Sequence, residues 1–233
     1  MGTRIALCIM AKAPEPGQVK TRLCPPLSPE DAAELYRCFL VDKIAQAREV
    51  TGAELALAYA PALAAALFEA LAPGFTLLAQ RGADLTARIV AVCDELFRIG
   101  YDAAILIDSD TPTLPTERLE SAVAVMSHGA HDLVLGPSED GGYYLIGLRR
   151  PHPGLFEGMR WSTPTVLEET LRRARALGLS SARLPAWYDV DTPADLARLR
   201  AELAAGSGGG PRHTRRFLLE RLAAGTAAPG GRA

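Results

Sequence analysis

Residues 5–23 read IALCIMAKAPEPGQVKTRL, an apolar run of strand length followed by a loop with proline, glycine and three positively charged side chains. The apolar run, residues 5–10, predicts a buried strand. It is far too short to span a membrane. In an α/β domain, ligands bind at the carboxyl ends of the strands. The stretch therefore predicts the first strand of such a domain, with a ligand-binding loop directly after it.

Outward from this stretch, strand-length apolar runs alternate with segments of helical periodicity. Strands are expected over residues 5–10, 54–60, 75–79, 103–107, 132–136, 143–148 and 182–185. Helices are expected from Ser28 and over residues 61–72, 84–99, 115–127, 163–177 and 192–204. Ser28 and Thr192, each followed by proline, are typical N-caps. The alternation predicts a three-layer α/β/α sandwich, a Rossmann-like fold with a mostly parallel sheet.

Composition limits the classes of protein that this chain can represent. Its 233 residues are 48% hydrophobic and carry a formal net charge of −2. The hydrophobic content is enough to build a sizeable core. The absence of a surplus of basic residues argues against a nucleic-acid partner. The four cysteines form no CxxC pair, which is typical of reduced thiols in a cytoplasmic protein. We expect a globular domain over residues 1–205 and no membrane association. Residues 206–233, which begin GSGGGP, are expected to form a flexible linker and tail, in which residues 212–223 are compatible with a short helix.

The loop after the first strand carries Lys12, Lys20 and Arg22 around a proline- and glycine-containing turn. Three cations and free backbone amides suit a di- or triphosphate, so we expect nucleotide contacts here, with Ala11 and Gly17 contributing backbone. The loop matches neither GxGxxG nor GxxxxGK[ST]. The alternative is a solvated surface loop.

Paired acids follow the apolar strand at 103–107, in the stretch IDSDTPTLP, residues 107–115. Alternate residues of an extended chain point the same way, so Asp108 and Asp110 are expected to converge on one cation. Carboxylates favour Mg²⁺ or Mn²⁺, which would make Asp110 catalytic by neutralising charge on a leaving phosphate. The alternative is that these acids cap the helix near Pro115.

A second acidic alternation lies in WYDVDTP, residues 187–193. Asp189 and Asp191 come just before a helix that Thr192 is expected to cap. Asp191 is the expected third metal ligand. Helix capping is an equally good interpretation of either acid alone.

The stretch EDGGYYL, residues 139–145, joins two expected strands. Asp140 is a candidate base for an acceptor hydroxyl, and Gly141, Gly142 and Tyr143 are candidate acceptor contacts. The alternative is a plain hairpin turn. Trp161, in the segment RWST, is a further candidate for the acceptor pocket, although a Trp packed beside a capped helix fits equally well.

A last candidate segment, QRGADL at residues 80–85, follows the third expected strand. Gln80, Gly82 and Asp84 are expected to contact the base or ribose of a nucleotide. A structural turn is the alternative interpretation. The four histidines have no metal-ligand spacing and are given no role.

As an ordered set, these motifs resemble the nucleotide-diphospho-sugar transferase superfamily with the GT-A fold. The similarity is greatest to the uncharacterised bacterial glycosyltransferase-A-like group, of DUF2064 type, that is linked to arsenosugar biosynthesis. The similar segments are AKAPEPGQVKTRL, QRGADL, DSDTPTLP, DGGYYLIGL, RWST and DVDTPADL, within residues 5–199. The resemblance implies a first loop around the nucleotide and a divalent metal at Asp110, assisted by Asp191. The KTRL loop also resembles that of phospholactate guanylyltransferases.

Three functions follow from this resemblance and these residues. The first is a metal-dependent glycosyltransferase that uses a nucleotide-diphospho-sugar and a small-molecule acceptor. The second is a nucleotidyltransferase that joins an NTP to a phosphorylated small molecule with release of pyrophosphate. The chain lacks the GGxxxR loop of well-known sugar nucleotidyltransferases, which favours the first. The third is a nucleotide-binding module without catalysis.

Overall fold

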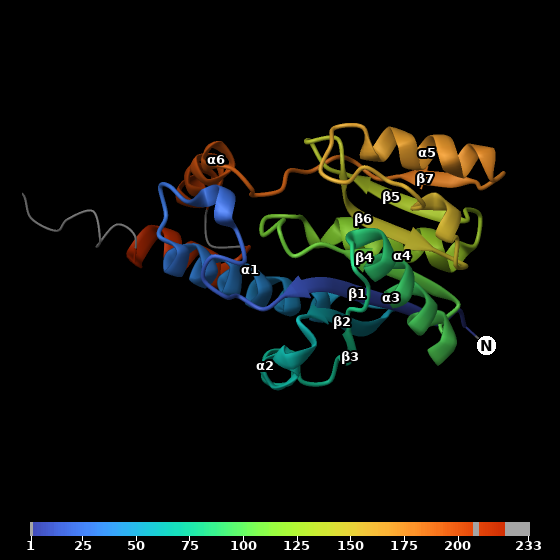
Figure 1. The fold of residues 1–233 in the computed structure, drawn as a ribbon, viewed down its shortest axis with the longest axis horizontal. Helices are drawn as coiled ribbons and strands as arrows, with labels where there is room; N and C mark the ends of the chain where they lie inside the picture. Colours follow the sequence, from blue (N-terminus) through green and yellow to red (C-terminus); the bar gives the residue numbers. More distant parts are fainter. Residues whose placement is uncertain (1, 207–209, 222–233) are drawn as a thin grey trace, which may run out of the picture.

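The computed structural model describes residues 2–206 and 210–221. Within them, seven strands form one sheet in the order β3-β2-β1-β4-β6-β5-β7 (Figure 1). The strands are β1 (Ile5–Lys12), β2 (Glu54–Ala60), β3 (Thr76–Ala79), β4 (Ala103–Ile107), β5 (Leu133–Pro137), β6 (Tyr143–Leu148) and β7 (Ser181–Arg183). Neighbouring strands are parallel except at β6, which runs antiparallel to both β4 and β5. The predicted, mostly parallel sheet is confirmed.

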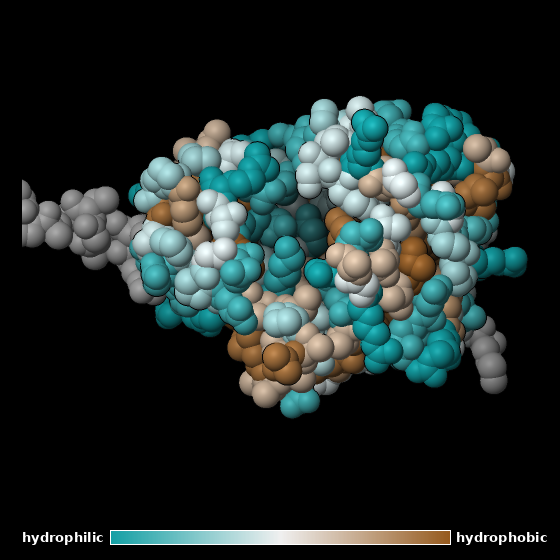
Figure 2. Space-filling view, in the orientation of Figure 1, coloured by the Kyte–Doolittle hydropathy of each residue, from teal (hydrophilic) through white to brown (hydrophobic). Residues whose placement is uncertain are grey.

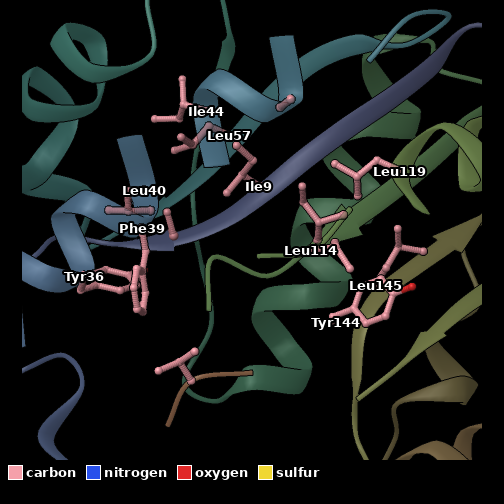
Figure 3. Close-up of a cluster of buried hydrophobic side chains, with 14 of the residues drawn as sticks. Ile9, Tyr36, Phe39, Leu40, Ile44, Leu57, Leu114, Leu119, Tyr144 and Leu145 are labelled. Carbon is pink, nitrogen blue, oxygen red and sulfur yellow. The ribbon is translucent and has the colours of Figure 1, made fainter. Parts of the chain in front are cut away.

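Helices cover both faces of this sheet. The α-helices are α1 (Pro29–Glu49), α2 (Ala65–Leu71), α3 (Leu85–Ile99), α4 (Thr116–His128), α5 (Val166–Ala176), α6 (Pro193–Ala205) and α7 (Arg212–Arg216). Alternate residues of β1 enter two different cores, because successive side chains of a strand point to opposite faces. Leu7 and Ile9 pack in the core that includes α1, α4 and α6, whereas Ala6 and Cys8 pack with α3 and α5. The α/β/α sandwich is thereby confirmed. Figure 3 shows side chains of α1 in the core that contains Ile9.

Two helix starts that border the site follow from local sequence. Ser28 accepts a hydrogen bond from the Asp31 amide at 3.0 Å, directly before α1. Thr192 and Asp195 form a reciprocal capping box at the start of α6. A third expected start was wrong. α5 begins at Val166, and the Thr163 hydroxyl instead donates to the Arg160 carbonyl.

The chain beyond α6 packs against the domain where a flexible tail was expected. α7 and the π-helical turn Phe217–Arg221 lie against α1. The Asp42 carboxylate accepts hydrogen bonds from the amides of His213 (3.0 Å) and Thr214 (2.8 Å) and from the Thr214 hydroxyl (2.7 Å). Leu218 is fully buried in the same core. The predicted boundary therefore needs correction for residues 210–221; residues 207–209 and 222–233 lie outside the described part of the chain.

Asp42→Ala should release this C-terminal segment. The substitution removes the acceptor of three hydrogen bonds to a buried carboxylate, and hydrogen bonds to charged groups make a net contribution of about 1.5–3 kcal/mol each. We expect hydrogen exchange of the His213 and Thr214 amides to accelerate at least about tenfold. Asp94→Ala, at an exposed position of α3, is the matched control. Unchanged exchange in Asp42→Ala would show that apolar packing alone holds the segment.

Candidate active site

The sheet brings three of the sequence motifs to one edge. β1 and β4 are parallel neighbours, and Ile9 pairs with Ile107. The loop after β1 and the acidic turn after β4 therefore leave the same edge. β6 is antiparallel to β4 and pairs Leu145 with Ile107, so the turn that precedes β6 lies there too. Figure 2 shows a recess in the middle of this view, between α6 and the part that carries β5 and β7, with a hydrophilic floor.

Lys20 joins the first loop to both acidic segments. Its Nζ lies 2.7 Å from Asp110 Oδ1 and 2.8 Å from Asp191 Oδ1. The Lys20 side chain is 4% exposed, whereas the two carboxylates are 36% and 38% exposed. Arg22 stands further out, with Nη1 3.8 Å from Asp191 Oδ2. Cationic and acidic motifs separated by up to 171 residues thus meet at one point.

The Lys20 ammonium is held in its charged form. Burial lowers the pKa of Lys20, but the charges of Asp110 and Asp191 and their hydrogen bonds outweigh it, so the pKa is raised overall. Lys20 also adopts a left-handed backbone conformation, with φ of 48°. Such strain in a residue other than glycine persists only where its surroundings enforce it, and it is concentrated at functional sites.

Asp108 is used within its own turn. One of its oxygens, Oδ1, accepts hydrogen bonds from the Thr111 hydroxyl at 2.7 Å and from the Asp110 amide at 3.3 Å. Lys43, from α1, supports the turn by donating to the Thr111 carbonyl (2.9 Å) and hydroxyl (3.1 Å). Burial raises the pKa of Asp108 and the nearby Lys43 charge opposes the rise, whereas burial lowers the pKa of Lys43. Asp108 and Asp110 therefore point to different partners.

The carboxylates allow a test of the expected metal site. Among residues 2–206 and 210–221, no three or more His, Cys, Asp or Glu side chains are grouped to hold a metal ion. The expected set of Asp108, Asp110 and Asp191 is therefore not assembled, because Asp108 is engaged in its turn. Asp110 and Asp191 do converge on one cation, the Lys20 ammonium. Two carboxylates fit Mg²⁺, which usually binds one or two of them and completes its shell with water and phosphate.

A cavity of about 250 Å³ opens beside these acids. Its polar lining consists of four acids and three hydroxyl side chains: Asp108, Asp110, Asp140, Asp189, Ser138, Ser162 and Thr163. The remaining lining is largely apolar and aromatic, and comes from α3, the end of β4, β6 and the segment around Trp161. Pockets for drug-sized ligands measure roughly 300–1,000 Å³, so this one suits a single small group.

The 138–142 turn donates hydrogen bonds to two of the acids that line the cavity. Asp140 accepts a hydrogen bond from the Gly142 amide at 2.8 Å. Asp189 accepts one from the Ser138 hydroxyl at 2.8 Å. Burial raises the pKa of Asp189, and the charges of Asp140 and Asp191 raise it further. The segment is the hairpin between β5 and β6, and Asp140 and Gly142 also line the cavity.

Gly141 packs closely against the backbone at the start of α5. Its φ is +91°, and a Cβ there would lie 2.1 Å from the Pro164 carbonyl oxygen. Its own carbonyl accepts a hydrogen bond from the Leu167 amide at 2.9 Å. Gly141 does not line the cavity described above, so its close backbone approach is to the start of α5.

Two aromatic side chains complete the cavity wall. Trp161 donates from Nε1 to the Thr86 hydroxyl at 2.8 Å, and that hydroxyl donates to the Phe156 carbonyl. Tyr143 meets Trp161 edge-on, with ring centroids 6.3 Å apart. Burial raises the pKa of the Tyr143 hydroxyl, which stays neutral. Trp161 and Tyr143 thus stand at the cavity in fixed orientations.

The QRGADL segment makes hydrogen bonds that connect strand ends and cap a helix. Gln80 donates from Nε2 to the carbonyls of Ala11 (2.9 Å) and Ala58 (2.7 Å), at the ends of β1 and β2. Asp84 caps α3 by accepting from the Ala87 amide at 2.8 Å. A Cβ on Gly82 would lie 2.5 Å from the Ala87 Cβ. Contact of Gln80, Gly82 and Asp84 with a nucleotide stays a prediction.

The outer part of the first loop is open to solvent. Lys12 and Arg22 are exposed, and Gly17 is exposed with φ of +74°. Ala11 is buried, and its carbonyl is the one that accepts from Gln80. Lys12, Arg22 and Gly17 are therefore accessible to a ligand, whereas Ala11 is not, and contact of any of the four with a nucleotide stays a prediction.

Tyr36, Lys43 and Ser109 shape the site although sequence reasoning did not single them out. The Tyr36 hydroxyl accepts from the Lys12 amide at 3.1 Å and contacts the Ser109 hydroxyl at 2.8 Å. Ser109 in turn donates to the Met10 carbonyl at 3.1 Å, which ties the acidic turn to β1. One signal was available: Tyr36 and Lys43 lie seven residues apart, on one face of α1.

Comparison with known proteins places this arrangement in a family. The family model described as "Uncharacterized protein conserved in bacteria (DUF2064)" matches residues 43–163, just over half of the chain. A crystal structure of a proposed nucleotide-diphospho-sugar transferase from Desulfovibrio desulfuricans G20 is 35% identical, with a TM-score of 0.86, and the match covers 95% of this chain and 96% of that one. No curated protein matches the sequence.

More distant structures share the fold. CMP:2-keto-3-deoxy-manno-octonic acid synthetase in complex with CTP is 17% identical with a TM-score of 0.56, over 87% of this chain and 99% of that one. A 4-diphosphocytidyl-2C-methyl-D-erythritol synthase from Anaerococcus prevotii is 10% identical with a TM-score of 0.59, over 87% and 97%. Within the described residues, no helix has the length and apolar character needed to cross a membrane. The chain belongs to the DUF2064 family, and its fold is the Rossmann-like fold of nucleotide transferases.

Proposed function

We propose that this protein is a metal-dependent glycosyltransferase that transfers a sugar from a nucleotide-diphospho-sugar to a small-molecule acceptor. The observation that carries the proposal is the convergence of Lys20 with Asp110 and Asp191 at 2.7 and 2.8 Å, beside the 250 Å³ cavity. The 35% identity to a proposed nucleotide-diphospho-sugar transferase supports it.

The first loop supplies the donor site in this proposal. Lys20 and Arg22 bind the diphosphate, and the exposed Lys12 extends the positive surface. Asp110 and Asp191 are the residues that would hold Mg²⁺ or Mn²⁺. When bound, the ion neutralises the charge that develops on the departing diphosphate. The Lys20 ammonium, held in its charged form, would then pair with the phosphates.

The chemistry is a displacement at the anomeric carbon of the donor sugar. An acceptor hydroxyl oxygen forms a bond to that carbon, and the bond from carbon to the phosphate oxygen breaks, so the nucleoside diphosphate leaves with the electron pair. The acceptor proton passes to a carboxylate, for which Asp140 is the candidate. Asp140 lines the cavity, and its Oδ1 is oriented by the Gly142 amide.

Nucleotidyl transfer is the second candidate. It is favoured by the similarity in fold to CMP:2-keto-3-deoxy-manno-octonic acid synthetase, whose structure contains CTP. In nucleotidyl transfer to a phosphorylated small molecule, a phosphate oxygen of the acceptor forms a bond to the α-phosphorus of an NTP. The bond from that phosphorus to the β-phosphate oxygen breaks, and pyrophosphate leaves. Release of pyrophosphate from an NTP therefore supports nucleotidyl transfer, and release of a nucleoside diphosphate from a nucleotide-sugar supports glycosyl transfer. Binding without either release would support the module without catalysis.

Lys20→Met should weaken donor binding at least about tenfold, because the buried ammonium is the proposed phosphate ligand. The measurement is a thermal-shift panel of NTPs and nucleotide-sugars with and without Mn²⁺. A ligand at a hundredfold its Kd adds about 2.7 kcal/mol, which corresponds to roughly 5–10 °C for a chain of this size. Arg175→Met removes an exposed charge from α5 and is the control. Equal shifts in the wild type and Lys20→Met would remove Lys20 from the donor site.

A further inference from the structure

The cavity beside Lys20 has charged side chains of one sign. Asp108, Asp110, Asp140 and Asp189 line it, and no Lys, Arg or His among the described residues does so. Two of these charges have a cationic counterpart: Asp110 contacts Lys20, and Asp108 is linked through Thr111 to Lys43.

Asp140 and Asp189 have neutral partners. They accept hydrogen bonds from the Gly142 amide and the Ser138 hydroxyl, respectively. Neither makes an ion pair within the part of the chain that the structure describes. A ligand group that enters the cavity therefore meets two carboxylates that no cation of the described residues pairs with, Asp189 half-buried and Asp140 exposed.

The apolar part of the cavity lining has a fixed geometry. Trp161 is held by its hydrogen bond to Thr86, and Tyr143 packs against it. Leu85 and Ile89 of α3 extend this surface. A cavity lined by both aromatic rings and carboxylates matches a ring that has an apolar face and donates hydrogen bonds from its edge.

We propose that the cavity is the acceptor subsite and that it selects an uncharged or cationic hydroxylated ring, such as a sugar or an amino sugar. It rejects a ring that carries a carboxylate or a phosphate at the buried end. This inference rests on the proposed function, because the cavity is an acceptor subsite only if the first loop holds the donor. The cavity stays negative when the donor site is occupied, because the two positive charges of a divalent ion cancel the two negative charges of a diphosphate diester.

The test uses four sugars that differ mainly in charge: glucose, glucosamine, glucuronate and glucose 6-phosphate. The chain has two tryptophans, and Trp187 does not line the cavity, so Trp187→Phe leaves Trp161 as the sole tryptophan reporter. Fluorescence titration of this variant should show glucose and glucosamine binding at least about tenfold more tightly than glucuronate or glucose 6-phosphate. Equal or tighter binding of the anionic sugars would overturn the proposal.

Asp189→Asn in the same background separates charge from shape. The asparagine oxygen can still accept from Ser138, so the wall is kept while one charge is lost. The preference for glucose over glucuronate should shrink several-fold, whereas Asp94→Asn, an exposed residue of α3, should leave it unchanged. An unchanged preference in Asp189→Asn would also overturn the proposal. Nucleotide binding is followed separately by thermal shift: its absence contradicts the proposed function, and its presence with a preference for anionic sugars contradicts this inference alone.

Discussion

Asp110→Asn is expected to lower kcat by about a hundredfold or more, with the fold intact. Asp110 is one of the two carboxylates that converge on the position of the Lys20 ammonium, where the metal ion is proposed to bind. Removing a single group that stabilises charge in a transition state costs about 10²–10³ in kcat. The measurement is release of nucleoside diphosphate or pyrophosphate from the nucleotide that the thermal-shift panel identifies, over a series of Mn²⁺ concentrations.

The Asn side chain keeps the shape and one acceptor oxygen, so folding and the Lys20 contact are retained. Asp94→Asn, which makes the same chemical change at an exposed site on α3, should have full activity. Asp191→Asn should resemble Asp110→Asn, because both carboxylates contact the same Lys20 Nζ. Turnover by Asp110→Asn at the wild-type rate, with unchanged Mn²⁺ dependence, would remove this residue from the metal site.

The fold was predictable because its signals are local. The run from Ala103 to Ile107 is wholly apolar and buried, and Ser28 and Thr192 bond to their own helices as N-caps. The meeting of Lys20 with Asp110 was also predictable, because it needs only the rule that parallel strands share their carboxyl edge.

The remaining features depend on contacts that no local pattern contains. In the sequence, Gly141 looks like a glycine that lets the backbone approach a ligand. In the structure, the backbone that it approaches is that of Pro164. Asp108 was assigned to the metal, but the Thr111 hydroxyl three residues away captures one of its oxygens. The same oxygen accepts from the Asp110 amide two residues on, a bond that aspartate commonly makes in turns, so this engagement of Asp108 was accessible to sequence reasoning. The docking of Thr214 on Asp42 spans 172 residues and was not.

Lys43→Met is expected to lower the free energy of unfolding by about 3 kcal/mol, because the ammonium makes hydrogen bonds that a thioether cannot replace. Lys43 is 1% exposed and donates to the carbonyl and hydroxyl of Thr111 and to Gln46 Oε1 at 3.0 Å. Without it, the Thr111 carbonyl keeps only the Leu114 amide of these two donors, and Asp108 loses a nearby positive charge. Urea denaturation measures the change, and Lys12→Met, at an exposed lysine, should stay within about 0.5 kcal/mol of the wild type.

A double-mutant cycle decides whether the loss comes from the Asp108 charge. If Lys43 stabilises the protein by balancing that carboxylate through Thr111, then Asp108→Asn in the Lys43→Met background should restore about 1 kcal/mol or more. Strictly additive losses would mean that Lys43 acts only through its bonds to the Thr111 backbone and Gln46. The distinction matters for the site, because the same turn ends in Asp110. A turn held by charge balance should change the Mn²⁺ affinity of Lys43→Met, whereas a turn held by the Asp108–Thr111 bond alone should leave that affinity at the wild-type value.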